Sequence, residues 1–185
     1  MFVNKEELIR KYTDAIRKGN AAIFAGAGLS YPSGYVNWKE LLRPFAAHLK
    51  LDIEKETDYL AVAQYYLNEK ANRNAVSQEI LDSFGKDAGK NINVDIITRL
   101  PIYTYWTTNY DKLLENGLRS ANRRPDIKIE SKHLFNTVRD RDAIVYKMHG
   151  DVDHPADAVL TKDDYVLYDN NRPLFKTVLK GDLIS

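Results

Sequence analysis

The chain has 185 residues, of which 44% are hydrophobic and 29% charged, and its formal net charge is +1. This length and composition are typical of a globular protein, and we expect residues 1–185 to form a single domain. The near-zero charge gives no general attraction to nucleic acid or to an anionic membrane, so neither is expected as a partner. One local basic cluster, Arg119, Arg123 and Arg124, is interpreted as a solvated helix end.

The sequence contains no cysteine, which excludes disulfides and zinc sites built on cysteine. No run of apolar residues reaches the length of a membrane span, and the N-terminal residues lack the apolar core of a signal peptide. A cytoplasmic location is therefore the expectation.

Apolar residues at three- and four-residue spacings predict a first helix over residues 5–18. The apolar run Ala21–Ala25 predicts a short buried strand, which leads directly into the glycine-containing segment Gly26–Ser30. A second helix is predicted over residues 38–49, with a kink or a later start near Pro44.

Helical patterns continue over residues 54–84, with a break near 72–74. A polar loop is predicted over 85–93 and a short helix over 94–100. These helices exceed what is needed to connect two neighbouring strands. We therefore expect those of approximately 52–93 to form a cap beside the ligand site.

The second half of the chain alternates strand and helix patterns. Further strands are predicted at 102–107, 127–129, 143–148 and 158–160, and helices at Leu113, Leu114 and Leu118 and at Leu174, Phe175, Val178 and Leu179. Such alternation indicates a parallel α/β sheet. We predict a Rossmann-like parallel sheet with helices on both faces, in which ligands bind beyond the carboxyl ends of the strands.

The order of a buried strand, a glycine turn and a helix is the arrangement in which backbone N–H groups and a helix dipole hold a phosphate. Gly26 and Gly28 can adopt positive φ and allow the backbone to approach a ligand closely. The alternative is an ordinary turn, because Gly-x-Gly often follows a strand without binding anything. Ser30 can contact the phosphate or cap the helix.

Three predicted strands end in residues suited to ligand chemistry, namely Gly26–Ser30, Thr107–Asp111 and His149–Asp151. The carboxyl ends of parallel strands lie at the same edge of a sheet. Ordinary loop polarity explains all three endings together less well than it explains each one alone. We therefore expect one site at this edge.

The chain resembles the catalytic core of the sirtuin (SIR2) family in three ordered motifs: Gly26-Ala27-Gly28-Leu29-Ser30, Thr107-Thr108-Asn109-Tyr110-Asp111 and Lys147-Met148-His149-Gly150-Asp151. It is more similar to the SIR2-like NADases of bacterial anti-phage defence proteins, which carry Thr-Thr-Asn-Tyr-Asp where sirtuins carry Thr-Gln-Asn-Ile-Asp. Gly34, Trp38, Leu41 and Leu42 are similar to a further segment of that branch.

The departures from the sirtuin pattern bear on activity. Deacylating sirtuins have a four-cysteine zinc module and a Pro-Asp-Phe-Arg segment, whereas this chain has no cysteine and has Tyr35-Val36-Asn37-Trp38 at the second place. Deacylation is therefore not expected. The family also has a later strand with Gly-x-Ser that holds the adenosine side of NAD, and nothing similar precedes Ser185. We expect the chain to be the N-terminal part of a longer protein, with its last strand or strands missing.

The resemblance implies an NAD site in which Gly26, Ala27, Gly28 and Ser30 hold the pyrophosphate. His149 is the predicted catalytic base, because imidazole titrates near neutral pH and this one ends an apolar strand. His48, His133 and His154 lack that setting and are interpreted as helix-face or loop residues.

Asn109 is the second predicted catalytic residue, positioning the attacking water or binding the ribose hydroxyls. Asp111 accepts from the nicotinamide amide in this interpretation. The alternative for both is a turn and helix cap, where Asn and Asp are favoured. Thr161-Lys162-Asp163-Asp164-Tyr165 also resembles a segment of SIR2-like domains and is expected to start a helix.

An acidic cluster, Asp151, Asp153, His154 and Asp157, has a composition that suits a hard cation. Loop acidity is the commoner cause of such a cluster, so no metal and no zinc are predicted.

The leading hypothesis is an NAD+ glycohydrolase that releases nicotinamide and ADP-ribose, acting as the effector of an anti-phage abortive-infection system. The resemblance implies a sensor or oligomerisation module fused to it or in a partner protein, and a homo-oligomer. Two alternatives remain: ADP-ribosyl transfer or deacylation, and a nucleotide-binding interaction module without catalysis.

Overall fold

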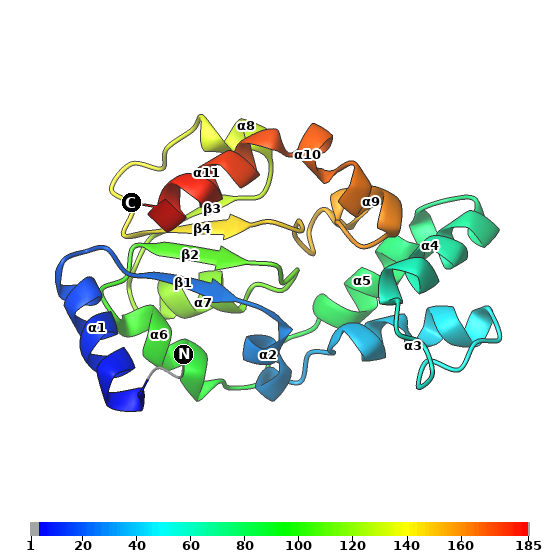
Figure 1. Cartoon of the computed structure of the whole chain (residues 1–185), viewed down its shortest axis with the longest axis horizontal. Coiled ribbons are helices and arrows are strands. Elements are labelled where there is room, and N and C mark those ends of the chain that lie inside the picture. Colours follow the sequence, from blue (N-terminus) through cyan, green and yellow to red (C-terminus); the bar gives the residue numbers. More distant parts are fainter. Residues whose placement is uncertain (1–3, 185) are drawn as a thin grey trace.

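The computed structural model describes residues 4–184. Four strands, β1 (Ala22–Ala25), β2 (Thr104–Thr107), β3 (Pro125–Lys128) and β4 (Ala143–Lys147), form one sheet in the order β1-β2-β4-β3, with all neighbours parallel. In Figure 1 the strands run side by side, with their carboxyl ends directed toward a separate group of helices. The predicted parallel α/β fold is confirmed.

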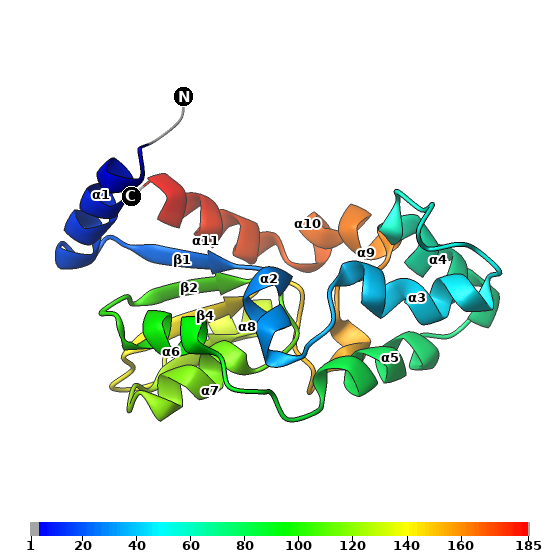
Figure 2. The ribbon, with the colours of Figure 1, turned by 90° about the horizontal axis from the view of Figure 1, so that it is seen from below.

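Helices cover both faces of the sheet, as predicted. On one face, α6 (Ile92–Arg99) and α7 (Leu113–Ser120) pack against Tyr105 and Val145. On the other, α11 (Pro173–Ile184) brings Phe175 against the stacked rings of Trp106 and Tyr146, whose centroids lie 4.1 Å apart. Figure 2 shows α6 and α7 on the side of the sheet opposite α11. Neighbouring residues of β2 face opposite layers because side chains alternate along a strand.

Two further helices bury fewer of their residues than the helices on the faces of the sheet do. Helix α1 (Lys5–Arg17) is capped by Asn4 and followed by Gly19, whose φ of 74° terminates it in the predicted place. It fully buries none of its residues, and only Ala15 and Ile16 pack against the core beneath α6 and α7. The short α8 (Ser131–Leu134) follows β3 and lies against α11.

The predicted helical cap lies beyond the carboxyl ends of the strands (Figure 1). It contains α4 (Tyr59–Lys70) and α5 (Asn74–Phe84), and it also includes α3 (Trp38–His48) and α9 (Lys162–Val166). Its apolar core extends into the loops of the sheet, where Tyr110, Leu113, Val152 and Leu160 join it. These loops therefore follow the carboxyl ends of the strands and also form the base of the cap.

The start of α3 is fixed by a capping box in which Asn37 and Glu40 bond each other's backbone N–H. The helix continues past Pro44 to His48, so it neither starts nor ends at the proline. Within the segment predicted as helix over 54–84, residues 54–58 are not helical, because Asp58 caps α4 by accepting from the N–H of Ala61.

The predicted last strand at 158–160 is wrong, although Ala158, Val159 and Leu160 are all buried. Three of their backbone groups bond to side chains, and the Val159 N–H donates to the carbonyl of His149, which lies outside the strands. The Tyr110 hydroxyl donates to the Val159 carbonyl at 2.7 Å, and the Leu160 N–H donates to Asp164 at 2.9 Å. These residues are apolar because they are buried in the cap core. Their composition therefore resembles that of a strand, although they do not pair with one.

Two smaller predictions also differ from the structure. Strand β3 spans 125–128 instead of 127–129. Arg123 is not part of a solvated helix end, because its guanidinium donates to the carbonyls of Thr98, Leu100, Ile102 and Asp142. These bonds hold the connection between α6 and β2 in place. No helix within residues 4–184 is long and apolar enough to cross a membrane.

The contact between α6 and α7 generates a prediction about stability. A Cβ added to Gly117 would lie 2.6 Å from Cγ1 of Val94 and 3.0 Å from Cγ2 of Thr98. Gly117→Ala should therefore lower the free energy of unfolding by about 1 to 3 kcal/mol, despite alanine's higher helix propensity. Gly181→Ala in α11, where the space is open, is the matched control and should be neutral or stabilising. Urea titration checks both, and equal stabilities of the two variants would contradict the close packing.

Candidate functional site

The glycine segment forms the short helix α2 (Ala27–Ser30) directly after β1, with Gly26 at its N-cap. Gly26 has a φ of −121°, and neither it nor Gly28 is among the glycines with positive φ, so the predicted left-handed conformation is wrong. A Cβ on Gly28 would meet nothing within 4 Å. The first N–H groups of a helix have no partner inside it, so this end of α2 presents donors beside open space.

A chain of hydrogen bonds joins the first two motifs. The Asn109 amide donates to the Gly26 carbonyl at 3.0 Å and to the Ser30 hydroxyl at 2.8 Å. The Ser30 hydroxyl in turn donates to the Asp111 carboxylate at 2.6 Å. Ser30 and Asp111 are only 2% and 4% exposed. The structure thus brings Gly26, Ser30, Asn109 and Asp111 together as predicted.

These contacts test the alternative structural roles that the sequence suggests for Ser30 and Asp111. Ser30 makes no side-chain cap to a helix, so the capping interpretation of this residue is wrong. Asp111 accepts from the Leu113 N–H at 3.0 Å, in the turn that leads into α7, and therefore has the turn role as well as its bond to Ser30. The N-cap of α7 itself is Lys112.

His149 lies at the end of β4, beside the loop that holds Asn109. Thr107 pairs with Lys147 in the sheet, so Asn109 and His149 both follow their paired residues by two positions. Gly150 has a φ of +99°, a conformation that favours glycine, and a Cβ there would come within 3.2 Å of Ala158. The sharp turn after His149 therefore requires Gly150.

The His149 ring packs edge-on against Tyr165, with ring centroids 5.2 Å apart, and the Tyr165 hydroxyl lies 3.5 Å from both ring nitrogens. Burial, with a smaller contribution from the positive charge of Arg172, lowers the pKa of His149 to about 4. The imidazole is therefore neutral at physiological pH, and its unprotonated nitrogen has a lone pair that can accept a proton.

The other histidines occupy the helix-face and loop positions that were predicted. His48 contacts Glu69 at 3.0 Å on the outside of the cap, and His133 belongs to the capping box of α8. His154 is an exposed loop residue before the turn Pro155–Asp157.

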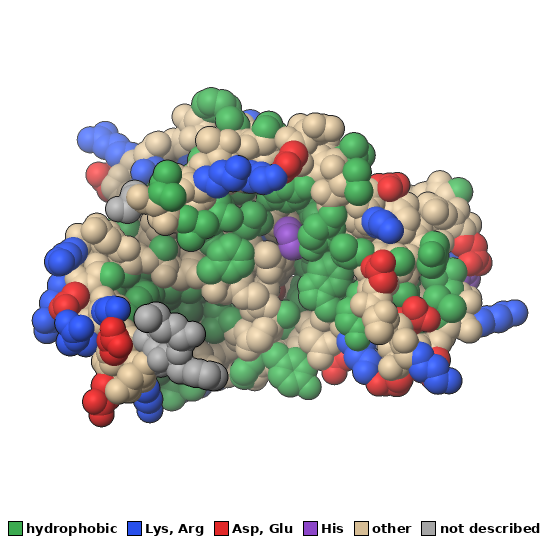
Figure 3. All heavy atoms as spheres, in the orientation of Figure 1, with side chains coloured by type: hydrophobic (Ala, Val, Ile, Leu, Met, Phe, Trp, Pro, Cys, Tyr) green, Lys and Arg blue, Asp and Glu red, His purple; other side chains and the backbone are tan. Residues whose placement is uncertain are grey.

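Two adjoining spaces reach this edge of the sheet from the cap side. A cavity of about 20 Å³ lies among Ala27, Ser30, Trp38 and Asn109. An open cleft of about 380 Å³ is lined by Trp38 and Tyr165, with residues 57–60 of the cap. Trp38 borders both spaces, and Tyr165, which lines the open cleft, packs against His149. Figure 3 shows a histidine side chain near the middle of this face, flanked by apolar side chains.

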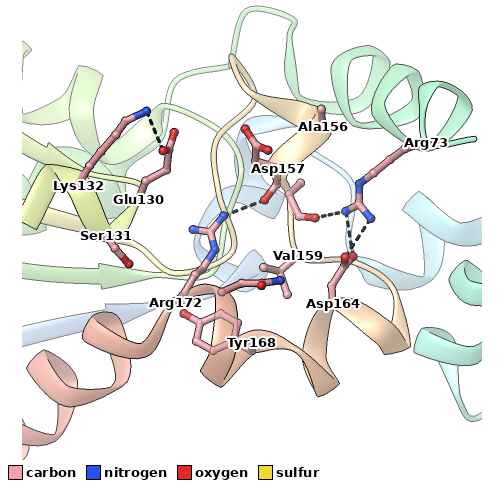
Figure 4. Close-up of a pocket in the computed structure, with 12 residues that line it drawn as sticks. Arg73, Glu130, Ser131, Lys132, Ala156, Asp157, Val159, Asp164, Tyr168 and Arg172 are labelled. Atoms are coloured by element: carbon pink, nitrogen blue, oxygen red, sulfur yellow. Dashed lines mark hydrogen bonds and ion pairs between the residues drawn. The ribbon is translucent and has the colours of Figure 1, made fainter.

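A third cavity, of about 440 Å³, is lined in part by Tyr168, a residue that also contacts the His149 ring. Figure 4 shows Arg73 and Arg172 reaching toward residues 157–158 from opposite sides. Arg172 donates to the carbonyls of Ile129 and Asp157 at 2.5 and 2.7 Å, and Arg73 donates to the Ala158 carbonyl while pairing with Asp164. These bonds fix the loop that follows His149.

The acidic cluster considered as a cation site is dispersed. Asp151 pairs with Lys147, and Asp153 pairs with Lys112. Among residues 4–184 no group of three or more potential ligands is arranged to hold a metal ion. The segment Thr161–Tyr165 does start a helix, α9, with Thr161 as the capping residue.

Sequence reasoning missed Arg172, and it named Lys147 and Tyr165 only as members of motifs, without a role in this site. Lys147 ends the apolar run of β4 and is fully buried, which is rare for a lysine. A lysine inside a strand predicted to be buried was the one available signal, because a buried ammonium requires specific partners.

The comparisons with known proteins bear on this arrangement. The family model of the SIR2-like domain matches residues 103–185, which include Asn109, Asp111 and His149. The whole chain is 50% identical to a protein named NAD(+) hydrolase ThsA from Cytobacillus dafuensis, of which it spans 37%. The predicted resemblance to SIR2-like domains is confirmed.

Two further relatives extend this SIR2-like match. The chain is 49% identical over 97% of its length to the NAD(+) hydrolase ThsA of Bacillus cereus (strain MSX-D12), and it spans 38% of that protein. It is 29% identical over 96% of its length to Defense-associated sirtuin 2 of Bacillus subtilis, and spans 18% of it. The chain therefore spans well under half the length of these curated relatives.

The low pKa of His149 predicts how stability depends on pH. The unfolded chain takes up this proton near pH 6.5 and the folded protein only near pH 4, so the contribution of His149 is complete above pH 6.5 and is lost as the pH falls toward 4. Between pH 7 and pH 5 this loss amounts to roughly 2 kcal/mol.

His149→Gln should therefore reduce the fall in unfolding free energy between pH 7 and pH 5 by about 2 kcal/mol. Urea titrations at the two pH values measure this difference. His154→Gln, at an exposed position, is the control and should behave as the wild type does. A pH dependence unchanged by His149→Gln would contradict the depressed pKa.

Proposed function

We propose that this chain is the NAD+ glycohydrolase domain of a longer anti-phage defence protein, cleaving NAD+ to nicotinamide and ADP-ribose. The observation that carries the proposal is the contact of the glycine segment with Asn109 and Asp111, at the strand edge where His149 also lies. The names of the relatives, NAD(+) hydrolase and defence-associated sirtuin, support both the reaction and its setting.

The reaction breaks the bond between nicotinamide and the ribose C1′ through an oxocarbenium-like transition state, and water then bonds to C1′. Nicotinamide is a good leaving group, so the protein chiefly has to hold the two parts of the substrate and orient the water. The N–H groups of Ala27 and Gly28 at the start of α2 suit the pyrophosphate, with Gly26 and Ser30 completing that surface.

His149 is the proposed base for the attacking water. Its pKa of about 4 makes it a weak base, but an oxocarbenium-like carbon is so electrophilic that the water needs little activation. Asn109 lies two residues beyond the paired end of the neighbouring strand and is suited to orient the water or the ribose hydroxyls. Asp111 retains lone pairs after its bonds to Ser30 and Leu113, so it can also accept from the nicotinamide amide.

One observation favours a second candidate function, an interaction module that binds nucleotide without hydrolysing it. The cavity beside Ser30 and Asn109 measures only about 20 Å³, which is room for about one water molecule. Catalysis in this arrangement therefore requires this cavity to widen.

The remaining length of the relatives supports partner modules. Since the chain spans 37 to 39% of four NAD(+) hydrolases, we propose that a sensor or oligomerisation module accompanies it and that the protein acts as a cytoplasmic homo-oligomer. No contact with nucleic acid is proposed for this domain.

Nicotinamide release from NAD+ by the full-length protein tests the function directly. His149→Ala should lower turnover by about 100-fold or more, the usual contribution of a positioned base. Asn109→Ala should lower it by about 100-fold, the effect of misplacing a reacting group. His154→Ala is the control and should stay within about 2-fold of the wild type.

An absence of nicotinamide release from the wild type, or release untouched by both substitutions, would overturn the proposal. Binding of NAD+ without release favours the non-catalytic module. Release that requires an added peptide acceptor would indicate a transferase.

A further inference from the structure

Lys147 is the last residue of β4 and precedes His149 by two positions. Its side chain is 0% exposed, and its Nζ lies within hydrogen-bond distance of four oxygens. These are the carbonyls of Tyr110 at 3.1 Å and Asp111 at 2.6 Å, and the carboxylates of Glu115 at 2.9 Å and Asp151 at 2.5 Å. An ammonium has three protons, so every proton is used.

The charges around Lys147 keep it protonated. Burial favours the neutral amine, but the neighbouring carboxylates of Glu115 and Asp151 outweigh burial and hold the pKa of Lys147 above its ordinary value. Burial also raises the pKa of Glu115, whose Oε2 has no hydrogen-bond partner among residues 4–184. A buried carboxylate oxygen without a hydrogen-bond partner lowers the stability of the fold, so stability alone does not explain this arrangement.

Three of the four partners of Lys147 belong to the two loops that hold the proposed site, and the fourth, Glu115, lies on α7. Tyr110 and Asp111 continue directly from Asn109, and Asp151 follows His149 and Gly150. The same Tyr110 carbonyl also accepts from the Val152 N–H at 3.0 Å, so the two loops are cross-linked at one point. An apolar side chain in this place would leave the buried carbonyls of Tyr110 and Asp111 without this donor.

We propose that Lys147 is a positioning residue that sets the distance between the Asn109–Asp111 loop and His149. This inference rests on the proposed function, since the reaction is what requires both loops in one geometry. Lys147 touches neither the site cavity nor the substrate in this role. It acts through the two backbone carbonyls and the Asp151 carboxylate.

The chain offers a matched control in Lys128, which is 3% exposed and pairs with Asp126 at 2.8 Å. Lys128 lies on β3, at the far edge of the sheet, and its partners are Asp126 and the Asn136 carbonyl. Replacing it removes a buried ammonium of the same kind without disturbing the loops after β2 and β4.

The experiment compares nicotinamide release and thermal stability for Lys147→Met, Lys128→Met and the double variant Lys147→Met/Glu115→Leu in the full-length protein. Lys147→Met should lower kcat by about 100-fold, the effect of a misplacement near 1 Å, with a smaller change in KM. Lys128→Met should lose comparable stability but keep kcat within about 3-fold.

The double variant separates positioning from stability. Replacing a buried ion pair by apolar residues commonly restores stability, yet it does not restore a donor to the two carbonyls. Because the buried Asp151 carboxylate stays without its cation, we expect the double variant to regain part of the melting temperature lost in Lys147→Met, but not kcat. Recovery of kcat together with stability would overturn the proposal, as would failure of both Lys147 variants to fold while Lys128→Met folds.

Amide hydrogen exchange keeps the inference separate from the proposed function. Residues 109–113 and 149–153 should exchange at least about 10-fold faster in Lys147→Met than in Lys128→Met, because a local tether has been lost. If the wild type releases no nicotinamide, the hydrolase proposal fails, and exchange alone decides whether Lys147 positions these loops. Equal exchange in the two variants would overturn the positioning role.

Discussion

The parallel register of β1, β2 and β4 is the constraint on which the site depends. Ala25 pairs with Thr107 and Thr107 with Lys147, so three strands end at the same level and their polar continuations start side by side. Only in this register can the Asn109 amide reach both the Gly26 carbonyl and the Ser30 hydroxyl. A shift by one residue would turn each of these side chains toward the opposite face.

The helical cap is built on the same loops and is therefore mechanically joined to the site. Tyr110, Leu113 and Val152 contribute to the cap core, while their neighbours Asn109, Asp111 and Asp151 are polar and face the sheet edge. The cap also contacts His149 through α9, because Tyr165 packs edge-on against the imidazole ring. The Gln64 side chain of α4 in turn donates to Asp163 of α9. A change in the position of the cap thus changes what covers the histidine.

Much of this could be predicted from the sequence, because strands, helices and strand ends leave local patterns. The three motifs predicted that His149, Asn109 and Asp111 lie at the carboxyl edge of the sheet. The apolar patterns of the helices predicted the cap. The residues that were missed depend on contacts far apart in the chain. Arg172 acts on the site through residues 129 and 157, and Ala158–Leu160 has the composition of a strand because it is buried, not because it pairs. Neither fact can be read from a local window.

Glycine conformation shows the same limit at the scale of one residue. The sequence favoured positive φ at Gly26 and Gly28, whereas the positive φ occurs at Gly150, where the chain turns sharply after His149 and passes close to Ala158. At Gly28 the absence of a side chain leaves open space instead. The same residue type therefore serves two purposes on the two sides of the site, and only the path of the neighbouring chain distinguishes them.

Buried and half-buried cations satisfy loop carbonyls at several places in this molecule, and this explains how strands of four or five residues support such a site. Strands this short leave many carbonyls in the connections, and an unpaired buried carbonyl is costly. Arg123 bonds four of these carbonyls, and Lys147 and Arg172 bond two each. Each cation joins segments that are distant in sequence and thereby cross-links the loops. A site that must orient water and a sugar needs fixed loops, and here side chains supply the rigidity that the short sheet does not.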